Sequence, residues 1–156
     1  MFRCFLGLAL LLALASSAWA HDVIAIADGD TLTLLVQTLP VKIRLANIDA
    51  PEKKQPFGRW SKQSLSDLCW QKDAQYEAQT IDHYGRTVAV VTCDGVEVNR
   101  AQVERGAAWV YTKYNKDDSL PIVQTRAKIN KLGLWADSLS VPPWEWRRST
   151  IKNQPN

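Results

Sequence analysis

The chain has 156 residues, and 19 basic against 16 acidic side chains give it a formal net charge of +3. This charge permits a nucleic-acid partner but does not indicate one, because nucleic-acid-binding domains are usually clearly basic. The length fits one domain with a substantial core, and no linker, internal repeat or low-complexity tract argues against that organisation.

The first twenty residues predict a secretory signal peptide. A positive charge at Arg3 precedes an apolar run over residues 4–15, and Ala18 and Ala20 are small residues at the positions that a signal peptidase reads. An uncleaved membrane anchor is the alternative, but the run is shorter than the roughly 20 residues that span a bilayer. We therefore expect residues 1–20 to be removed, and an exported product, periplasmic or secreted, without further membrane contact.

Residues 21–148 are expected to form the folded domain, followed by a polar tail at residues 149–156 that is expected to fray. Removal of the signal peptide also removes Cys4, which leaves Cys69 and Cys93 in the exported protein. In an oxidising compartment these two residues are a candidate disulfide, and two independent buried thiols are the alternative.

Alternating hydrophobicity predicts five strands in the mature chain. They are Val23–Ala27, Thr31–Val36, Val41–Leu45, Ala74–Thr80 and Thr87–Cys93. The dipeptide Asp28-Gly29 predicts a hairpin between the first two strands. The first three strands are therefore expected to form an antiparallel meander, and residues 82–86 a turn between the last two.

Helical spacing and end signals predict about three helices, near Trp60–Trp70, Asn99–Arg105 and Ser119–Leu132. Asn99 and Ser119 are candidate N-caps, and Gly106 and Gly133 are candidate stops. Strands with helices between and after them indicate a small α+β domain. A five-stranded barrel of the oligonucleotide-binding (OB) type is the best candidate.

Three acidic residues are expected to meet at one end of the meander. Asp30 lies in the first turn, and the third strand returns to that end before a loop that carries Asp49 and Glu52. Clustered carboxylates repel one another unless a cation lies between them, and Ca²⁺ accepts irregular ligation by carboxylates, carbonyls and water. Ordinary turn chemistry is the alternative, because aspartate is common in turns.

Two arginines are expected near this acidic cluster. Arg44 lies toward the returning end of the third strand, and Arg86 closes the turn at residues 82–86. A single arginine on a strand is usually solvated, but two that converge can bind a phosphate and stabilise charge developing at phosphorus. Together with a cation and a spare carboxylate, they suit metal-assisted hydrolysis of a phosphodiester.

These residues stand in motifs that resemble the thermonuclease, or staphylococcal nuclease-like, family. The motifs are Asp28–Thr31, Ile43–Leu45, Ile48–Glu52, Asp82–Arg86, Val98–Asn99, Gly106–Tyr111 and Gly133–Trp135. Their order and spacing follow the family across residues 23–146, nearly the whole mature chain. The resemblance implies an OB-type barrel with three helices, one bound Ca²⁺ and nuclease activity on DNA and RNA.

The resemblance also implies roles for the acidic loop. Asp30 and Asp49 match the family's carboxylate ligands of calcium, and Ala50 matches the position that contributes a backbone carbonyl to the metal. Glu52 matches the carboxylate proposed to activate or position the attacking water.

Basic and aromatic positions follow the same correspondence. Arg44 and Arg86 match the phosphate-binding pair, and Tyr84 matches an aromatic residue that lines the nucleotide pocket. Tyr111 and Tyr114 are the candidates for stacking on nucleotides. His83 departs from the pattern, because some members carry a phosphate-contacting lysine there.

Residues 142–148 form a C-terminal extension. We interpret its tryptophans chiefly as core residues, and Arg147 and Arg148 as a candidate phosphate-contacting edge. The leading hypothesis is a calcium-dependent nuclease, expected to be a monomer, and the alternative is a non-catalytic OB-fold module that binds nucleic acid. A saccharide-binding barrel is a third possibility, but it leaves the arginine pair and the acidic loop unexplained.

Overall fold

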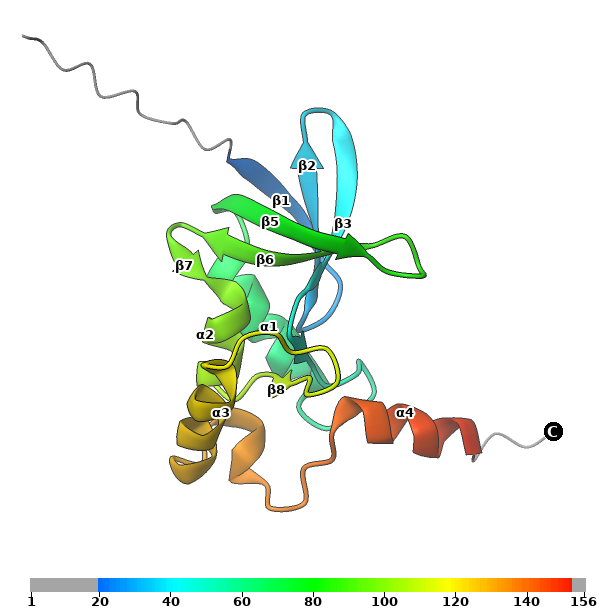
Figure 1. The fold of residues 1–156 in the computed structure, drawn as a ribbon, viewed down its shortest axis with the longest axis vertical. Coiled ribbons are helices and arrows are strands. Elements are labelled where there is room, and N and C mark those ends of the chain that lie inside the picture. Colours follow the sequence, from blue (N-terminus) through cyan, green and yellow to red (C-terminus); the bar gives the residue numbers. More distant parts are fainter. Residues whose placement is uncertain (1–19, 153–156) are drawn as a thin grey trace, which may run out of the picture.

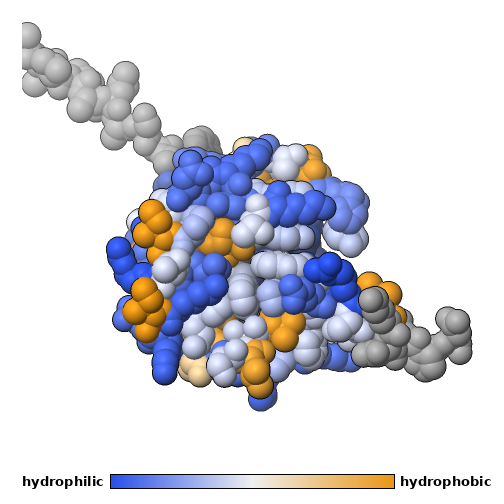
Figure 2. All heavy atoms as spheres, turned by 60° about the horizontal axis from the view of Figure 1, so that its bottom comes forward, coloured by the Kyte–Doolittle hydropathy of each residue, from blue (hydrophilic) through white to orange (hydrophobic). Residues whose placement is uncertain are grey.

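The computed structural model describes residues 20–152. The predicted signal peptide, apart from its last residue, and residues 153–156 of the predicted tail therefore lie outside the described part of the chain. Within the described part, no helix is both long enough and apolar enough to cross a bilayer. On the face shown in Figure 2, most of the surface is hydrophilic and the hydrophobic side chains form separate patches.

Five strands close into the expected OB-type barrel, so the α+β fold class is confirmed (Figure 1). They are β1 (His21–Ile26), β2 (Thr31–Val36), β3 (Leu39–Leu45), β5 (Asp73–Ile81) and β6 (Thr87–Cys93). Antiparallel neighbours follow the order β3-β2-β1-β5-β6, and a parallel pairing of β3 with β6 closes the barrel. In that closing pair Ile43 lies opposite Thr87, and Leu45 lies opposite Ala89.

The interior of the barrel is filled by the apolar members of the alternating strands. The fully buried strand residues include Leu32, Leu34, Ile43, Leu45, Ala89, Val91 and Cys93. Strand periodicity places every second side chain on the same face, which is why this set is almost entirely aliphatic. The same alternation sends Arg44 to the outside of the barrel wall, between two buried neighbours.

Three short strands were not predicted. β4 (Ile48–Asp49) pairs antiparallel with β8 (Trp109–Val110), and β7 (Val96–Glu97) extends the sheet beyond β6. The β4–β8 pair places Asp49 opposite Trp109. This pairing fixes the loop after β3 to a segment sixty residues further along the chain.

Four α-helices accompany the barrel, one more than the sequence analysis expected. They are α1 (Gly58–Cys69), α2 (Val98–Glu104), α3 (Leu120–Ile129) and α4 (Pro143–Lys152), and η1 (Gly133–Ala136) is a 3-10 turn. In Figure 1, α1, α2 and α3 lie together on one side below the barrel, and α4 lies apart from them. Residues 149–152, expected to be a frayed tail, belong to α4. Pro143 at its start and Glu145 in its first turn are helix-starting signals that support it.

One predicted helix cap is wrong. α2 begins at Val98 with Glu97 as its N-cap, so Asn99 lies inside the helix. Its amide is buried, accepts a hydrogen bond from the Val91 N–H at 2.9 Å, and donates to the carbonyls of Ala46 and Ala89. Asn99 therefore fastens α2 to β6 and to the end of β3. Ser119 does precede α3, as expected, although its side chain makes no capping bond.

Two glycines allow the ends of α2 and α3 to meet. Gly106 and Gly133 both have positive φ, and the Leu134 N–H donates to the Gly106 carbonyl at 3.0 Å. A β-carbon on Gly106 would collide with the Leu132 carbonyl. Gly106 therefore follows the end of α2 as expected, whereas α3 already ends at Ile129 with Asn130 as its C-cap, and Gly133 begins η1 instead. At the C-terminal end of α1, Cys69 forms a disulfide with Cys93 of β6.

Candidate active site

All of the predicted site residues line one pocket of about 610 Å³ at one end of the barrel. They are Asp30, Arg44, Asp49, Ala50, Glu52, Tyr84, Arg86, Tyr111 and Tyr114. The turn after β1, the end of β3, the β4 loop and the β5–β6 turn each contribute part of this set. The meander therefore brings the acidic residues among them to the lining of one pocket. Arg147 of α4 also lines the pocket, whereas its neighbour Arg148 is not among the lining residues.

Close packing of the turn after β1 holds Asp30 in place. A β-carbon on Gly29 would overlap the Ser61 side chain of α1 and approach Ala50, and the Gly29 carbonyl accepts a bond from the Gln102 amide at 2.6 Å. Gly29 does not have positive φ. This glycine, predicted as a hairpin signal, is required because the turn approaches α1 closely.

The Asp30 carboxylate is buried and surrounded by donors. Its Oδ2 accepts the Ala50 N–H at 2.6 Å, and its Oδ1 accepts the Thr31 hydroxyl at 3.0 Å. Burial raises the pKa of Asp30 to about 7, with further upward contributions from Asp28 and Asp49 that Arg44 and the Ala50 amide only partly offset. The surroundings of Asp30 therefore disfavour its ionised form.

Arg44 connects the two buried carboxylates. Its Nη1 lies 3.0 Å from Asp30 Oδ2, and its Nη2 lies 2.8 Å from Asp49 Oδ1. Nη1 also donates to the carbonyls of Leu45 and Ile48 at 3.1 and 3.0 Å. The guanidinium therefore fixes the end of β3, the start of β4 and both carboxylates as one unit.

Glu52 differs from Asp49 in exposure and in its partners. The Glu52 side chain is 40% exposed, whereas that of Asp49 is only 2% exposed. Arg147 bridges the two, with its Nη1 2.7 Å from Glu52 Oε1 and its Nη2 2.7 Å from Asp49 Oδ2. Arg147 is the third arginine of the site, and its sequence context predicted only a candidate phosphate-contacting edge.

Arg86 is held by the β5–β6 turn. Its Nε and Nη2 both lie 2.7 Å from Asp82 Oδ2, and the Arg86 N–H donates to Asp82 Oδ1. Burial alone would raise the pKa of Asp82, but the bonds from the Arg86 amide and guanidinium and from the Tyr84 amide keep it below its ordinary value. Arg44 and Arg86 thus enter the same pocket while bonded to different aspartates.

The three tyrosines of the pocket are not equivalent. Tyr84 and Tyr114 are 74% and 56% exposed, and although the His83 ring lies 3.8 Å from that of Tyr84, part of each ring is open to a ligand. Tyr111 lies parallel to Trp144 of α4, with ring centroids 5.3 Å apart and an interplanar angle of 2°. Its other contact is edge-on with Tyr114, at 4.9 Å. One face of Tyr111 is therefore occupied by the protein itself.

The donor set suits a hard cation such as Ca²⁺. Within residues 20–152, no group of three or more His, Cys, Asp or Glu side chains is arranged to hold a metal ion. Asp30 and Asp49 offer two buried carboxylates beside a polar pocket, so any further ligands must come from backbone carbonyls or water. Burial, together with Asp28 and Asp49, raises the pKa of Asp30, and a cation placed beside it would favour the ionised carboxylate. At Ala50, the contact present in the structure is made by the amide N–H.

The sequence of this chain is similar to those of known nuclease-family proteins. Residues 42–137 match a family model described as staphylococcal nuclease homologue. A protein of Escherichia coli O157:H7 named an uncharacterized endonuclease is 46% identical over 126 residues, which cover 80% of this chain and 82% of that protein. A Haemophilus influenzae protein of the same name is 44% identical, covering 81% of this chain and 71% of that protein.

A further relative extends the match over most of both chains. The micrococcal nuclease of Shigella flexneri is 36% identical over 162 aligned positions, covering 95% of this chain and 92% of that protein. The matched segment in the family model contains the acidic loop and two of the pocket arginines, together with the β5–β6 turn. The chain therefore belongs to the staphylococcal nuclease family and is a nuclease.

Proposed function

We propose that this nuclease depends on Ca²⁺ and hydrolyses phosphodiester bonds in both DNA and RNA. One observation carries the proposal: two buried carboxylates, Asp30 and Asp49, lie in the same pocket as Arg44, Arg86 and an exposed carboxylate. Carboxylate oxygens suit a hard divalent cation, and Ca²⁺ accepts irregular ligation by two carboxylates, a backbone carbonyl and water more readily than Mg²⁺, which requires a near-ideal octahedron. The adjacent guanidinium groups provide charge for a phosphate.

Asp30 and Asp49 would hold the cation, and the Ala50 carbonyl is the proposed backbone ligand. Bound there, Ca²⁺ supplies positive charge to the phosphate and lowers the pKa of a nearby water. Arg86 directs its Nε and Nη2 to Asp82, which orients the guanidinium toward the pocket. Its remaining nitrogen would donate to a phosphate oxygen and stabilise charge that develops during the displacement.

Glu52 is the proposed general base or water-orienting group. Its carboxylate lines the same pocket as Arg44 and Arg86, and its 40% exposure leaves it accessible to water. The exposed rings of Tyr84 and Tyr114 at the pocket would stack on bases, an interaction that every base can make. Such contacts do not select the sugar, which supports activity on both DNA and RNA.

We also propose that the protein acts after export. The signal peptide expected at residues 1–20 and the bonded pair Cys69 and Cys93 support an oxidising compartment. Thiol labelling of protein recovered from a periplasmic fraction and from the medium would locate it and report the state of both cysteines.

The proposal is tested with the purified mature protein and labelled single- and double-stranded DNA and RNA. Each substrate is incubated with Ca²⁺, with Mg²⁺, or with a chelator. We expect cleavage of all substrates with Ca²⁺ and little with Mg²⁺ or chelator. Full activity in Mg²⁺ with calcium chelated would overturn the metal assignment. Tight binding without cleavage in any metal would favour the binding-module alternative.

A further inference from the structure

We propose that Arg147 is a positioning residue for the cleavage reaction, which holds the Glu52 carboxylate in place by bridging it to Asp49. The inference rests on the role proposed above for Glu52. It concerns a residue of the C-terminal helix, beyond the segment that matches the family model, which ends at residue 137.

The bridge joins a fixed carboxylate to an exposed one. Arg147 Nη2 lies 2.7 Å from Asp49 Oδ2, and Arg147 Nη1 lies 2.7 Å from Glu52 Oε1 and 3.4 Å from Asp49 Oδ1. Asp49 is buried and also bonded to Arg44, whereas the Glu52 side chain is 40% exposed. A planar guanidinium with two parallel donors fixes the direction and the length of its bonds to both carboxylates. The fixed position of Asp49 therefore also restricts the position of the Glu52 carboxylate.

Glu52 has little other support. Its loop, residues 50–57, contains no helix or strand. Among the described residues, Arg147 is the one side chain that bonds the Glu52 carboxylate. The Glu52 N–H donates to Gln55 Oε1 at 3.1 Å, which orders the backbone but not the carboxylate. Without Arg147, the carboxylate would therefore sample several rotamers.

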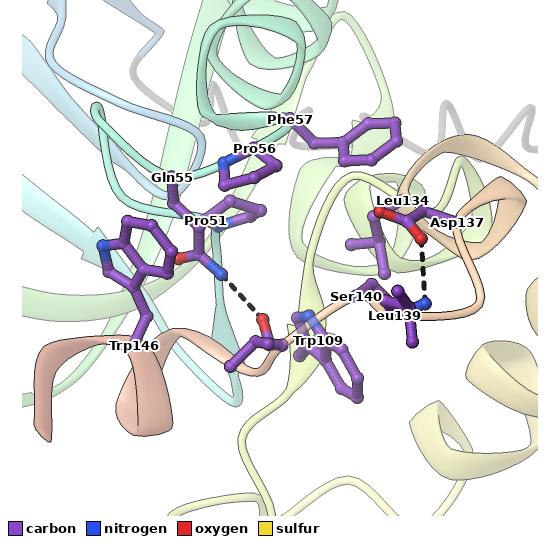
Figure 3. A pocket seen from close by; sticks show the side chains of 11 residues that line it. Pro51, Gln55, Pro56, Phe57, Trp109, Leu134, Asp137, Leu139, Ser140 and Trp146 are labelled. Atoms are coloured by element: carbon purple, nitrogen blue, oxygen red, sulfur yellow. Dashed lines mark hydrogen bonds between the residues drawn. The ribbon is translucent and has the colours of Figure 1, made fainter. Parts of the chain in front are cut away.

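The helix that carries Arg147 is anchored by residues that precede Arg147 in the chain. Trp144 stacks on Tyr111 and meets Trp109 edge-on at 6.0 Å. Trp146 points toward Pro51 and Gln55 across a small cavity of about 50 Å³ (Figure 3). The Gln55 amide donates to the carbonyl of Val141, just before the helix, at 2.7 Å. These contacts pack the start of α4 against β8 and the acidic loop.

Charge also favours the bridge. Burial would lower the pKa of Arg147, but the bonds to Asp49 and Glu52 raise it, so the guanidinium stays charged throughout the useful pH range. Arg148, the next residue, instead donates from Nε to the Trp144 carbonyl at 3.3 Å and lies outside the pocket lining. The two arginines share a helix and a formal charge, which makes Arg148 a matched control.

The test compares Arg147→Met, Arg147→Lys, Arg148→Met, Glu52→Gln and the double variant Arg147→Met/Glu52→Gln in the full mature protein. Methionine keeps much of the apolar stem, and lysine restores the charge without the bidentate fork. Single-turnover cleavage with enzyme in excess separates the maximal rate from the apparent affinity for substrate. Calorimetric titration with Ca²⁺ and circular dichroism report the metal site and the fold.

We expect Arg147→Met to lower the maximal rate by about 10- to 100-fold, the usual effect of losing a residue that orients a functional group, with affinity changed less than about threefold. Arg147→Lys recovers part of the rate, because an ammonium keeps the charge but lacks the planar fork whose two nitrogens fix both carboxylates. Arg148→Met cleaves at the wild-type rate. The double variant is no slower than Glu52→Gln alone, because Arg147 acts through Glu52.

Four results would overturn the inference itself, and a fifth would overturn the role proposed for Glu52 on which it rests. A weaker affinity with an unchanged rate makes Arg147 a direct phosphate contact, and tighter Ca²⁺ binding with unimpaired cleavage makes it a competitor of the cation. An equal loss from Arg147→Met in the wild-type and Glu52→Gln backgrounds excludes action through Glu52. Wild-type cleavage by Arg147→Met while Glu52→Gln is slow defeats this inference alone. Wild-type cleavage by Glu52→Gln instead defeats the role proposed for Glu52.

Discussion

The site has two halves that are built differently. The inner half consists of the buried carboxylates Asp30 and Asp49 and of Arg44, whose side chain is 12% exposed, and it is held by strand pairing, close packing and ion pairs. The outer half, Glu52 and Arg86, is more exposed and stands on a loop and a turn. Charged groups in the inner half contribute to folding as well as to function, whereas the outer half can be changed with little effect on the fold. The difference separates variants that should lose only turnover from variants that should lose both turnover and stability.

The largest expected effect is in the outer half. Glu52→Gln keeps the shape of the side chain but removes a carboxylate that would orient or deprotonate water, a role typically worth about 10²–10⁴-fold in rate. Binding of a non-cleavable oligonucleotide and the far-ultraviolet circular dichroism should stay close to wild type. An equal loss of binding and cleavage would mean that Glu52 only holds substrate.

Arg44→Ala and Arg86→Ala test the comparison directly, because they remove the same group from opposite halves. Each should slow cleavage about a hundredfold or more, through the loss of roughly 3 kcal/mol of transition-state stabilisation. Arg44→Ala should also lower the free energy of unfolding by about 3 kcal/mol, since it leaves buried Asp30 and Asp49 without their shared partner.

For Arg86→Ala the stability cost should be below about 1 kcal/mol, because its partner Asp82 lies near the surface. Urea denaturation beside single-turnover kinetics measures both quantities on the same samples. Equal stability losses for the Arg44 and Arg86 variants would remove the distinction between the halves.

The disulfide provides a stability change away from both halves. Cys69 and Cys93 lie 24 positions apart, and closing a loop of this size stabilises by about 3 kcal/mol in the chain-entropy model. The Cys69→Ser/Cys93→Ser variant should therefore unfold at lower urea concentration, yet cleave at the wild-type rate where it is folded. Alkylation of both thiols in native, unreduced protein would contradict the bonded state.

The smallest expected effect is a pH dependence from the inner half. The pKa of Asp30 is raised to about 7 in the folded protein, so its contribution to stability is present below its unfolded pKa near 3.8 and is lost as pH rises through 7. A cation needs the ionised form, so the affinity for Ca²⁺ should fall about tenfold between pH 8 and pH 6.

Thermal unfolding at both pH values, with and without Ca²⁺, measures this coupling between proton and cation. Metal-free wild-type protein should lose stability relative to Asp30→Asn as the pH rises, and Ca²⁺ should restore more stability at pH 8 than at pH 6. A pH-independent difference between wild type and Asp30→Asn would show that Asp30 titrates normally.

Local sequence patterns determined the strands, most of the helices and the members of the inner half. Alternation across residues 31–34 indicates which face enters a core, and a meander must return its third strand to the first turn. That geometry is sufficient to predict that Asp30 meets Asp49. The resemblance to a known family then added the roles of these residues, which alternation alone does not supply.

Tertiary structure alone decided which two strands close the barrel, the burial of Asn99 and the place of Arg147. An asparagine near a helix start is a good N-cap by local propensity, but here burial against β6 and the end of β3 outweighs that preference. The ion pairs of Arg147 join residues 95 and 98 positions apart, and the parallel pairing of β3 with β6 spans more than forty. Hydrophobic period and turn chemistry act over about ten residues, whereas these contacts depend on how completed elements pack against one another.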